Sequence, residues 1–385
     1  MSRLTLMAYE PLSENGLYYR EFVDDLTTNH QGWTHTICAV GGYESAGFTI
    51  KGTHDYLQDW FDDGLMRRIV LINPEGIVCW EGFVSRMTFN NGNSPETKSI
   101  EPLYNRIYMR YAPLDFSVFP PIASEPITLI VNNIASQINY GIKAGTISGG
   151  ERAPSTAYEW ATTVLEYSSA ENSLHGETVN TSGGGELSLN VECKGYYHTL
   201  KWIPYICTKT GYIQAQQVIQ EILEYYNLVN QGWISQNFGW FDWNFRTARR
   251  GRNELKSCWD EIADIIKEGG KGDTERWVGG LYQNRQMVYK AAEDYLGIYS
   301  DYDEVYRSMS DPAQFIYDSA TGTEIKPWDM LPDRILKTVD ASAGGNAYLK
   351  YIEQVVFTEP YGLQLVGGDD MRLTVFLTQR GLSSV

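Results

Sequence analysis

The chain has 385 residues and carries 31 Lys and Arg against 48 Asp and Glu, a formal net charge of −17 at pH 7. With 43% hydrophobic residues, 27 Tyr and 11 Trp, it is too apolar for a disordered protein and long enough for two or more domains. Its acidity argues against a dedicated binder of duplex DNA, whose affinity comes from Lys and Arg that displace counterions, but leaves open a surface past which DNA slides without binding.

The first half of the sequence reads mainly as strand. Alternating patterns and runs of β-branched and aromatic residues predict strands at 3–9, 33–40, 66–72, 77–90, 99–111, 186–194 and 197–206. The turn sequences NPEG at 73–76 and NNGN at 90–93 predict two hairpins. Because the segment 77–90 is longer than an ordinary strand, we expect it to bend, with Gly82 as the candidate position. Long, bent antiparallel strands are typical of small barrels.

Four segments carry the apolar stripe of an amphipathic helix, and they are 53–63, 155–167, 214–226 and 252–268. Thr53 is the expected N-cap of the first helix, and Pro154 precedes the second. Gly269 and Gly270 are expected to end the fourth. We expect these stripes to contact the core.

The second half repeats this plan after the fourth helix. Its expected strands are 275–282, 286–289, 314–317, 334–339, 347–358, 362–366 and 372–378. The sequence therefore predicts an α+β fold, mainly antiparallel β, in two halves. Residues 1–206 form the first half, with an α/β insertion at about 122–181, and residues 207–385 form a second helix-plus-β half.

No local pattern indicates catalysis or metal binding. The P-loop, H-E-x-x-H and G-x-S-x-G signatures are missing, and the five histidines are scattered. The five cysteines lack a C-x-x-C, which argues against a disulfide framework or a zinc cluster and favours folding in a reducing cytoplasm. Acidic clusters read as solvated surface, although a glycosidase pair of carboxylates distant in sequence stays open. We therefore name no catalytic, cofactor-binding or metal-binding residue.

One segment combines aromatic residues with cations. Aromatic side chains at 233–245 are followed by five cations within eleven residues, namely Arg246, Arg249, Arg250, Arg252 and Lys256. One interpretation is a stacking platform for single-stranded nucleic acid or a sugar phosphate. We favour a structural interpretation, because cations are unfavourable at the positive N-terminal end of the expected helix 252–268 and need acidic neighbours. A neighbouring subunit of so acidic a chain would supply them, so the five cations are candidate subunit-interface residues.

Seven segments together carry a resemblance over most of the chain. They are 75–87 (EGIVCWEGFVSRM), 103–111 (LYNRIYMRY), 139–143 (NYGIK), 191–200 (VECKGYYHTL), the helix 254–268, 276–280 (RWVGG) and 285–289 (RQMVY). In this order and spacing they resemble the hub, or tail-associated, proteins at the distal end of bacteriophage tails. The segments are turns, strand edges and core positions, and none is a catalytic fingerprint.

This resemblance implies two tandem β-barrel domains with smaller α/β insertions. It implies a homotrimer whose six barrels form a ring between the sixfold tail tube and the threefold tip. A tail-tube or distal tail protein would lie on one side and a tip or spike protein on the other, with DNA only in transit through the lumen and no membrane insertion. A lumen lined by carboxylates would repel phosphate over roughly 10 Å. We therefore expect a structural virion protein of the tail, assembled in the host cytoplasm, without cofactor or enzymatic activity.

Two other classes of function stay open. One is a carbohydrate-binding or carbohydrate-active β-protein that uses exposed tryptophans such as Trp240 and Trp243 as sugar platforms. The other is a different virion part, such as a connector or a receptor-binding tip. A polysaccharide assay tests the first alternative, and the symmetry of the particle tests the second.

Overall fold

The structure is a computed structural model of the whole chain. It describes residues 4–11, 22–90, 95–170, 174, 187–206, 211–230, 233–242, 247–249, 256–269, 276–292, 294–299, 315–318, 321, 324–332, 334–340, 346–359, 362–367 and 372–376. The fold is α+β and mainly antiparallel, as the sequence predicts. Within the described ranges, no helix combines the length and the apolar character needed to cross a lipid bilayer.

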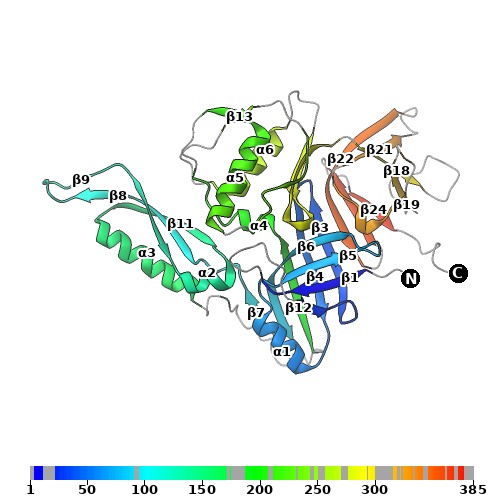
Figure 1. Cartoon of the computed structure of the whole chain (residues 1–385), viewed down its shortest axis with the longest axis horizontal. Helices are drawn as coiled ribbons and strands as arrows, with labels where there is room; N and C mark the ends of the chain where they lie inside the picture. The colour runs from blue at the N-terminus through cyan, green and yellow to red at the C-terminus, as the bar shows by residue number, and fades with distance from the viewer. Residues whose placement is uncertain are drawn as a thin grey trace.

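One antiparallel ladder organises the first half, and its strands are drawn mainly in blue in Figure 1. The strands are β1 (Thr5–Tyr9), β2 (Phe22–Asp25), β3 (His30–Cys38), β4 (Val40–Ile50), β5 (Arg68–Ile72), β6 (Val78–Asn90), β7 (Glu96–Ser99) and β12 (Ser188–Gly195). They pair in the order β2-β1-β5-β6-β12-β4-β3, with β7 added to β6.

The two ends of this ladder are consecutive in sequence. Strands β2 and β3 are joined by residues 26–29, where the Leu26 amide donates to the Leu6 carbonyl at 2.9 Å. The His30 amide in turn donates to the Leu26 carbonyl at 3.0 Å. A short segment therefore connects the two end strands of this ladder, and the two tandem β-barrels stay a prediction.

Strand β6 departs from a regular ladder at two positions. The pairing with β5 skips Cys79, and the pairing with β12 skips Ser85. The bend expected at Gly82 is therefore divided between two register shifts on either side of it. Gly82 has a different role, because a Cβ there would lie 2.3 Å from the Lys194 carbonyl oxygen. The glycine allows β12 to approach closely.

The core of the first half is rich in aromatic rings. Trp33 is fully buried and lies 5.6 Å from Trp80 and 5.4 Å from Phe48, measured between ring centroids. Helix α1 (His54–Asp63) covers one end of this core with Leu57, Trp60 and Phe61, and the Thr53 side chain caps it. The apolar stripe and the cap predicted for this helix are confirmed.

A smaller α/β unit projects from the body to the left of Figure 1, and we call residues 104–170 the arm. Its elements are β8 (Arg106–Asp115), β9 (Ile122–Ala123), β10 (Ile127–Asn132), β11 (Ala144–Arg152), α2 (Ile134–Tyr140) and α3 (Pro154–Ser169). The strands pair in the order β10-β8-β11, and α3 buries Ala157, Ala161 and Leu165 against β8. The insertion predicted at 122–181 thus shares its sheet with β8, which precedes that range.

Two strands of the second half join the ladder of the first. Strand β16 (Trp277–Leu281) pairs in parallel with β4, and β22 (Asn346–Thr358) pairs antiparallel with β3. The other described elements are β13 (Tyr212–Gln214), α5 (Ala215–Val229), β14 (Phe238–Phe241), β15 (Thr247–Arg249), α6 (Cys258–Glu268), η2 (Gln283–Arg285), β17 (Met287–Ala291), β18 (Asp294–Tyr299), β19 (Phe315–Asp318), β20 (Glu324–Ile325), η3 (Pro327–Asp329), β21 (Arg334–Asp340), β23 (Gly362–Gly367) and β24 (Arg372–Phe376). The two halves therefore share one hydrogen-bonded sheet.

The structure contradicts two sequence predictions, one at the end of the first half and one in the second half. The strand expected at 197–206 begins with a short helix, α4 (Tyr197–Leu200). Its buried residues are Tyr197, Thr199 and Leu200, and with the buried flanking residues Tyr196 and Ile203 they include the three- and four-residue spacing of a helix. Helix α6 begins at Cys258 with the Ser257 side chain as its cap, so its start lies inside the predicted range 252–268, whereas its end at Gly269 is confirmed.

Candidate functional site

The structure describes only part of the predicted cation cluster. Arg246, Arg250 and Arg252 lie outside the described residues, and Arg249 ends strand β15, which pairs with β13. The Lys256 ammonium lies 3.2 Å from the Asp264 carboxylate on α6, and both side chains are exposed. Lys256 is therefore paired with a carboxylate of its own chain, and a subunit-interface role for the five cations stays a prediction.

The aromatic residues before these cations divide into buried and exposed groups. Trp233 is buried in the core, whereas Trp240 is 60% exposed. Trp243, the second sugar platform that the sequence indicated, lies outside the described residues. The segment therefore combines core packing with at least one tryptophan that is open to solvent.

The arm carries an exposed apolar surface. Of the 18 large apolar side chains that are exposed in the described part of the chain, eleven lie on the arm. One is Tyr104 at its first residue, and the other ten are Phe116, Val118, Phe119, Ile122, Ile127, Ile130, Ile134, Ile138, Tyr158 and Tyr167. We call these ten residues the arm surface. Phe119 at its tip is 96% exposed. Because soluble monomers rarely expose large apolar patches, this concentration marks the arm as a candidate interaction surface.

Buried polar groups hold the base of the arm in place. The Asn105 amide donates to the Gly141 carbonyl at 2.7 Å, and its oxygen accepts from the Lys143 backbone at 2.8 Å. The Lys143 ammonium donates to the carbonyls of Ile100, at 2.8 Å, and Glu101. Burial lowers the pKa of Lys143 to about 8. These contacts fix the direction in which the arm leaves the body.

A buried carboxylate ties the two halves together. Glu81 on β6 is 1% exposed, and it accepts from the Arg68 Nε at 2.9 Å and from the Asn284 backbone amide at 2.9 Å. The Arg285 Nε lies 3.9 Å away, in the same turn as Asn284. Burial acts to lower the pKa of Arg68, but the Glu81 carboxylate outweighs it and the net direction is upward. Glu81 therefore joins β6 to η2 through charge and a backbone bond.

A second polar cluster resembles a catalytic arrangement but lacks a reactive nucleophile. Glu44 accepts from the Tyr197 hydroxyl, and its other oxygen lies 3.3 Å from the His198 Nε2. Burial opposes ionisation of Glu44, yet the bonds from His198 and Tyr197 lower its pKa to about 2. Burial and the nearby carboxylate raise the pKa of Cys38 to about 12, so its thiol stays protonated at neutral pH. The cluster therefore orders the region around α4 and offers no thiolate.

Among the described residues, no group of three or more His, Cys, Asp or Glu side chains is placed to hold a metal ion. His35 is fully buried, and burial lowers its pKa to about 3, so the ring is neutral. It accepts from the Trp33 indole at 2.9 Å, a bond between core side chains. The scattered histidines that the structure describes thus take part in packing and hydrogen bonding.

Comparison with known proteins gave no match to a family model and none to a curated protein. Among solved structures, the chain is similar to a tail protein from Neisseria meningitidis, with 6% identity and a TM-score of 0.40, over 97% of this chain and 96% of that one. It is also similar to a prophage tail protein from Listeria monocytogenes, with 9% identity and a TM-score of 0.39, over 95% of each chain. At such identities, no side-chain role can be transferred from either structure.

Proposed function

We propose that this chain is a structural protein of a bacteriophage tail, a homotrimeric hub that joins the sixfold tail tube to the threefold tip and conducts DNA during ejection. The sequence resemblance over most of the chain motivates this proposal, and we assign the chain no catalytic activity. The proposal of a homotrimer rests on the arm surface, which we assign to contact with a second copy of this chain.

The energetics of the arm tip support such a contact. Burying a large apolar side chain stabilises an interface by about 2 kcal/mol, so covering Phe116, Val118, Phe119 and Ile122 contributes several kcal/mol before the losses of association. The arm is held at its base by Asn105 and Lys143, so little ordering is needed when the tip docks. A preordered apolar projection is suited to locking neighbouring subunits together.

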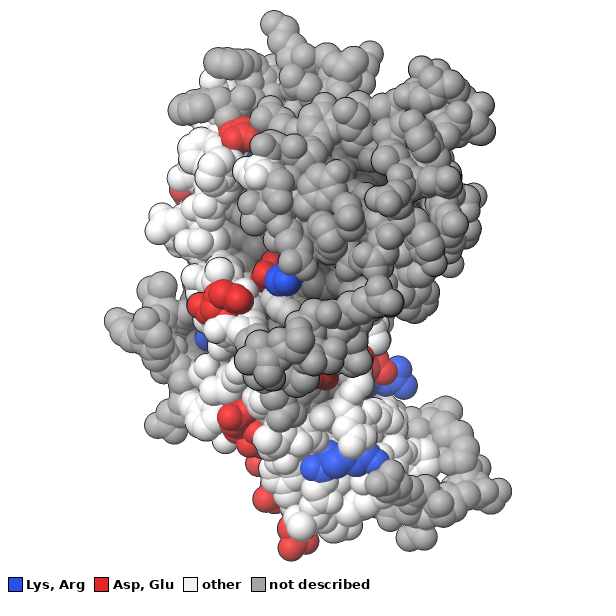
Figure 2. Space-filling view, turned by 90° about the vertical axis from the view of Figure 1, so that its right-hand side faces the viewer, with Lys and Arg blue, Asp and Glu red and all other residues white. Residues whose placement is uncertain are grey.

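The charge of the chain supports transit of DNA rather than binding. On the face shown in Figure 2, Asp and Glu lie over the described surface with a few Lys and Arg between them. A surface that binds duplex DNA needs an extended run of cations, because affinity rises with each phosphate neutralised. A net charge of −17 instead favours repulsion of phosphate along the proposed lumen.

Light scattering of the purified protein tests the trimer, together with class averages of negatively stained particles. We expect a particle of three times the 43.7 kDa chain mass, with threefold symmetry and an open centre. The double variant Phe116→Ser, Phe119→Ser should move the mass toward one chain, because it removes apolar area from the arm tip. Leu228→Ser, on α5 and 85% exposed, is the matched control and should leave the trimer intact.

A particle of single-chain mass for the unmodified protein would contradict the trimer. Another symmetry would favour a different virion part, such as a connector. An arm-tip variant that assembles as well as the control would remove the arm surface from the interface, even if the trimer itself were observed.

A further inference from the structure

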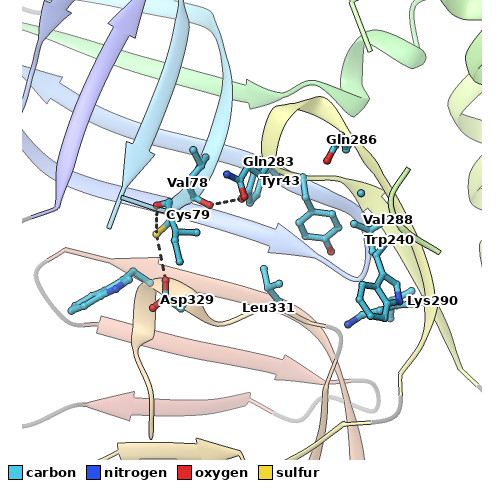
Figure 3. Close-up of a pocket in the computed structure, with 15 residues that line it drawn as sticks. Tyr43, Val78, Cys79, Trp240, Gln283, Gln286, Val288, Lys290, Asp329 and Leu331 are labelled. Atoms are coloured by element: carbon cyan, nitrogen blue, oxygen red, sulfur yellow. Dashed lines mark hydrogen bonds between the residues drawn. The ribbon is translucent and has the colours of Figure 1, made fainter. Parts of the chain in front are cut away.

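A cavity of about 430 Å³ lies where the two halves of the chain meet. Strands β4 and β6 of the first half line one side, and β14, β16, η2, β17 and η3 of the second half line the other. Figure 3 shows Trp240 and Lys290 at one end, Asp329 at the other, and Tyr43 and Leu331 between them. This volume falls in the range of small-molecule sites, roughly 300–1,000 Å³, which are mostly apolar with a few placed polar groups.

Trp240 forms an aromatic wall at the mouth of the cavity. Its side chain is 60% exposed, so the ring is not used as core packing. The indole N–H donates to the Asp242 carboxylate at 3.0 Å, which restrains the orientation of the ring. A large, oriented and exposed aromatic face is suited to stacking against another flat apolar surface.

Polar groups that line the same cavity still have hydrogen-bonding capacity. Within the described part of the chain, the side-chain amides of Gln283 and Gln286 have no hydrogen-bond partner. The Asp329 Oδ1 accepts from the Asn73 amide at 2.9 Å, while its Oδ2 has no partner among described residues. Amides supply both donors and acceptors, and a carboxylate supplies acceptors.

Trp328 also lines the cavity. Its indole N–H is shielded from solvent and has no partner among the described residues. A ligand in the solvent-open cavity does not reach this N–H, so Trp328 contributes apolar lining surface. The cavity therefore joins an aromatic wall to unused donors and acceptors on both sides.

We propose that this cavity binds a short neutral saccharide of one or two pyranose rings. The apolar C–H face of a pyranose stacks on an aromatic ring such as Trp240, while its hydroxyls both donate and accept and so match amides and carboxylates. The inference does not depend on the tail proposal, since it rests on this cavity alone.

Two other ligand classes fit the cavity less well. A phosphate-bearing ligand needs several cations, whereas Lys290 is the single Lys or Arg among the described lining residues and Asp329 would repel the phosphate. A wholly apolar protein segment would bury the two amides and the carboxylate without partners. A ligand with a hydroxyl-rich rim and an apolar face avoids both penalties.

Saturation-transfer NMR and calorimetry with the full chain test this site. The probes are glucose, galactose, mannose, N-acetylglucosamine, cellobiose, lactose and chitobiose, each at millimolar concentration. We expect at least one to bind with millimolar affinity, and Trp240→Ala to weaken it about tenfold by removing the stacking face. Trp240→Phe should restore part of the affinity, and Gln283→Ala should reduce it by a smaller factor.

Tyr212→Ala on β13 is the matched control, because it removes an aromatic ring that is 65% exposed and belongs neither to the cavity lining nor to the arm surface. It should bind the sugar as the unmodified chain does. Since Trp240 is exposed, its variants should keep the far-ultraviolet circular dichroism of the parent. The proposal is overturned if none of the seven sugars binds, or if a folded Trp240→Ala binds as well as the unmodified chain.

Discussion

Replacing Glu81 with Gln should destabilise the protein by removing a buried charge while keeping the shape of the side chain. Glu81 is 1% exposed and is the carboxylate that faces both Arg68 and Arg285. The oxygen of the introduced amide could still accept from the Asn284 backbone, so the perturbation is chiefly electrostatic. Two guanidinium groups would then lie against a neutral side chain.

The magnitude follows from the exposure of the two cations. Removing one partner of a buried ion pair costs about 3–5 kcal/mol, because the remaining charge is left without compensation. The side chains of Arg68 and Arg285 keep 23% and 19% of their exposure, so water recovers part of that loss. We therefore expect a loss of about 2–3 kcal/mol, or a fall of roughly 1 M in the urea midpoint.

Urea unfolding followed by tryptophan fluorescence measures this loss. Glu192→Gln is the matched control, since its carboxylate lies 3.8 Å from Arg86 and is 60% exposed, and a surface pair contributes about 0.5 kcal/mol or less. If the two variants shift the midpoint equally, the buried charge does not secure the contact between β6 and η2. A more stable Glu81→Gln variant would refute the argument outright.

Three further predictions concern backbone geometry, pH and helix capping. Gly42→Ala should destabilise far more than Gly76→Ala in urea unfolding. Both glycines have positive φ, +78° and +85°, and a side chain in this conformation costs about 1–2 kcal/mol at either position. A Cβ at Gly42 would also lie 2.4 Å from the backbone of β16, whereas nothing lies within 4 Å of a Cβ at Gly76. Equal losses of stability would contradict a close approach of β16. Burial lowers the pKa of Lys143 from 10.5 to about 8, so between these pH values the unfolded chain binds this proton more tightly than the folded chain does. The contribution of Lys143 to the free energy of unfolding should therefore rise from pH 8 to pH 10.5. Thermal melts of Lys143→Met should lose that part of the rise, and an unchanged pH profile would count against it. Ser257→Ala should cost about 1 kcal/mol in thermal unfolding by removing the cap of α6, and no loss would mean that the cap is dispensable.

Local patterns predicted the elements whose structure depends on near neighbours. The sequence predicted helix α1, its Thr53 cap and the end of α6 at Gly269. These features are predictable because caps, terminating glycines and apolar stripes lie within a few residues of one another. Strand patterns identified most of β8 within the predicted strand 99–111 but did not indicate which strands it pairs with. The residue pattern of a strand does not indicate its neighbours in the sheet, and in the structure β8 pairs with β10 and β11.

The candidate sugar site was only partly predictable from the sequence, because its residues come from distant segments. Trp240 was recognisable as an exposed aromatic candidate in a segment rich in such residues. Gln283 and Asp329 gave no signal, since they come from separate turns and meet Trp240 only in the folded chain. The arm surface was also missed, because sequence indicates that a side chain is apolar and not that it stays uncovered.

The pairing of β22 with β3 has a consequence during synthesis. It joins Thr34 to Thr358, which lie 324 positions apart in the chain. At a translation rate of roughly 5–20 residues per second, β22 is synthesised on the order of half a minute after β3. Its unpaired amides and carbonyls are meanwhile available to other nascent chains. Crowded translation should therefore favour exchange of β22 between chains, and a product that ends before residue 346 should aggregate through that open edge.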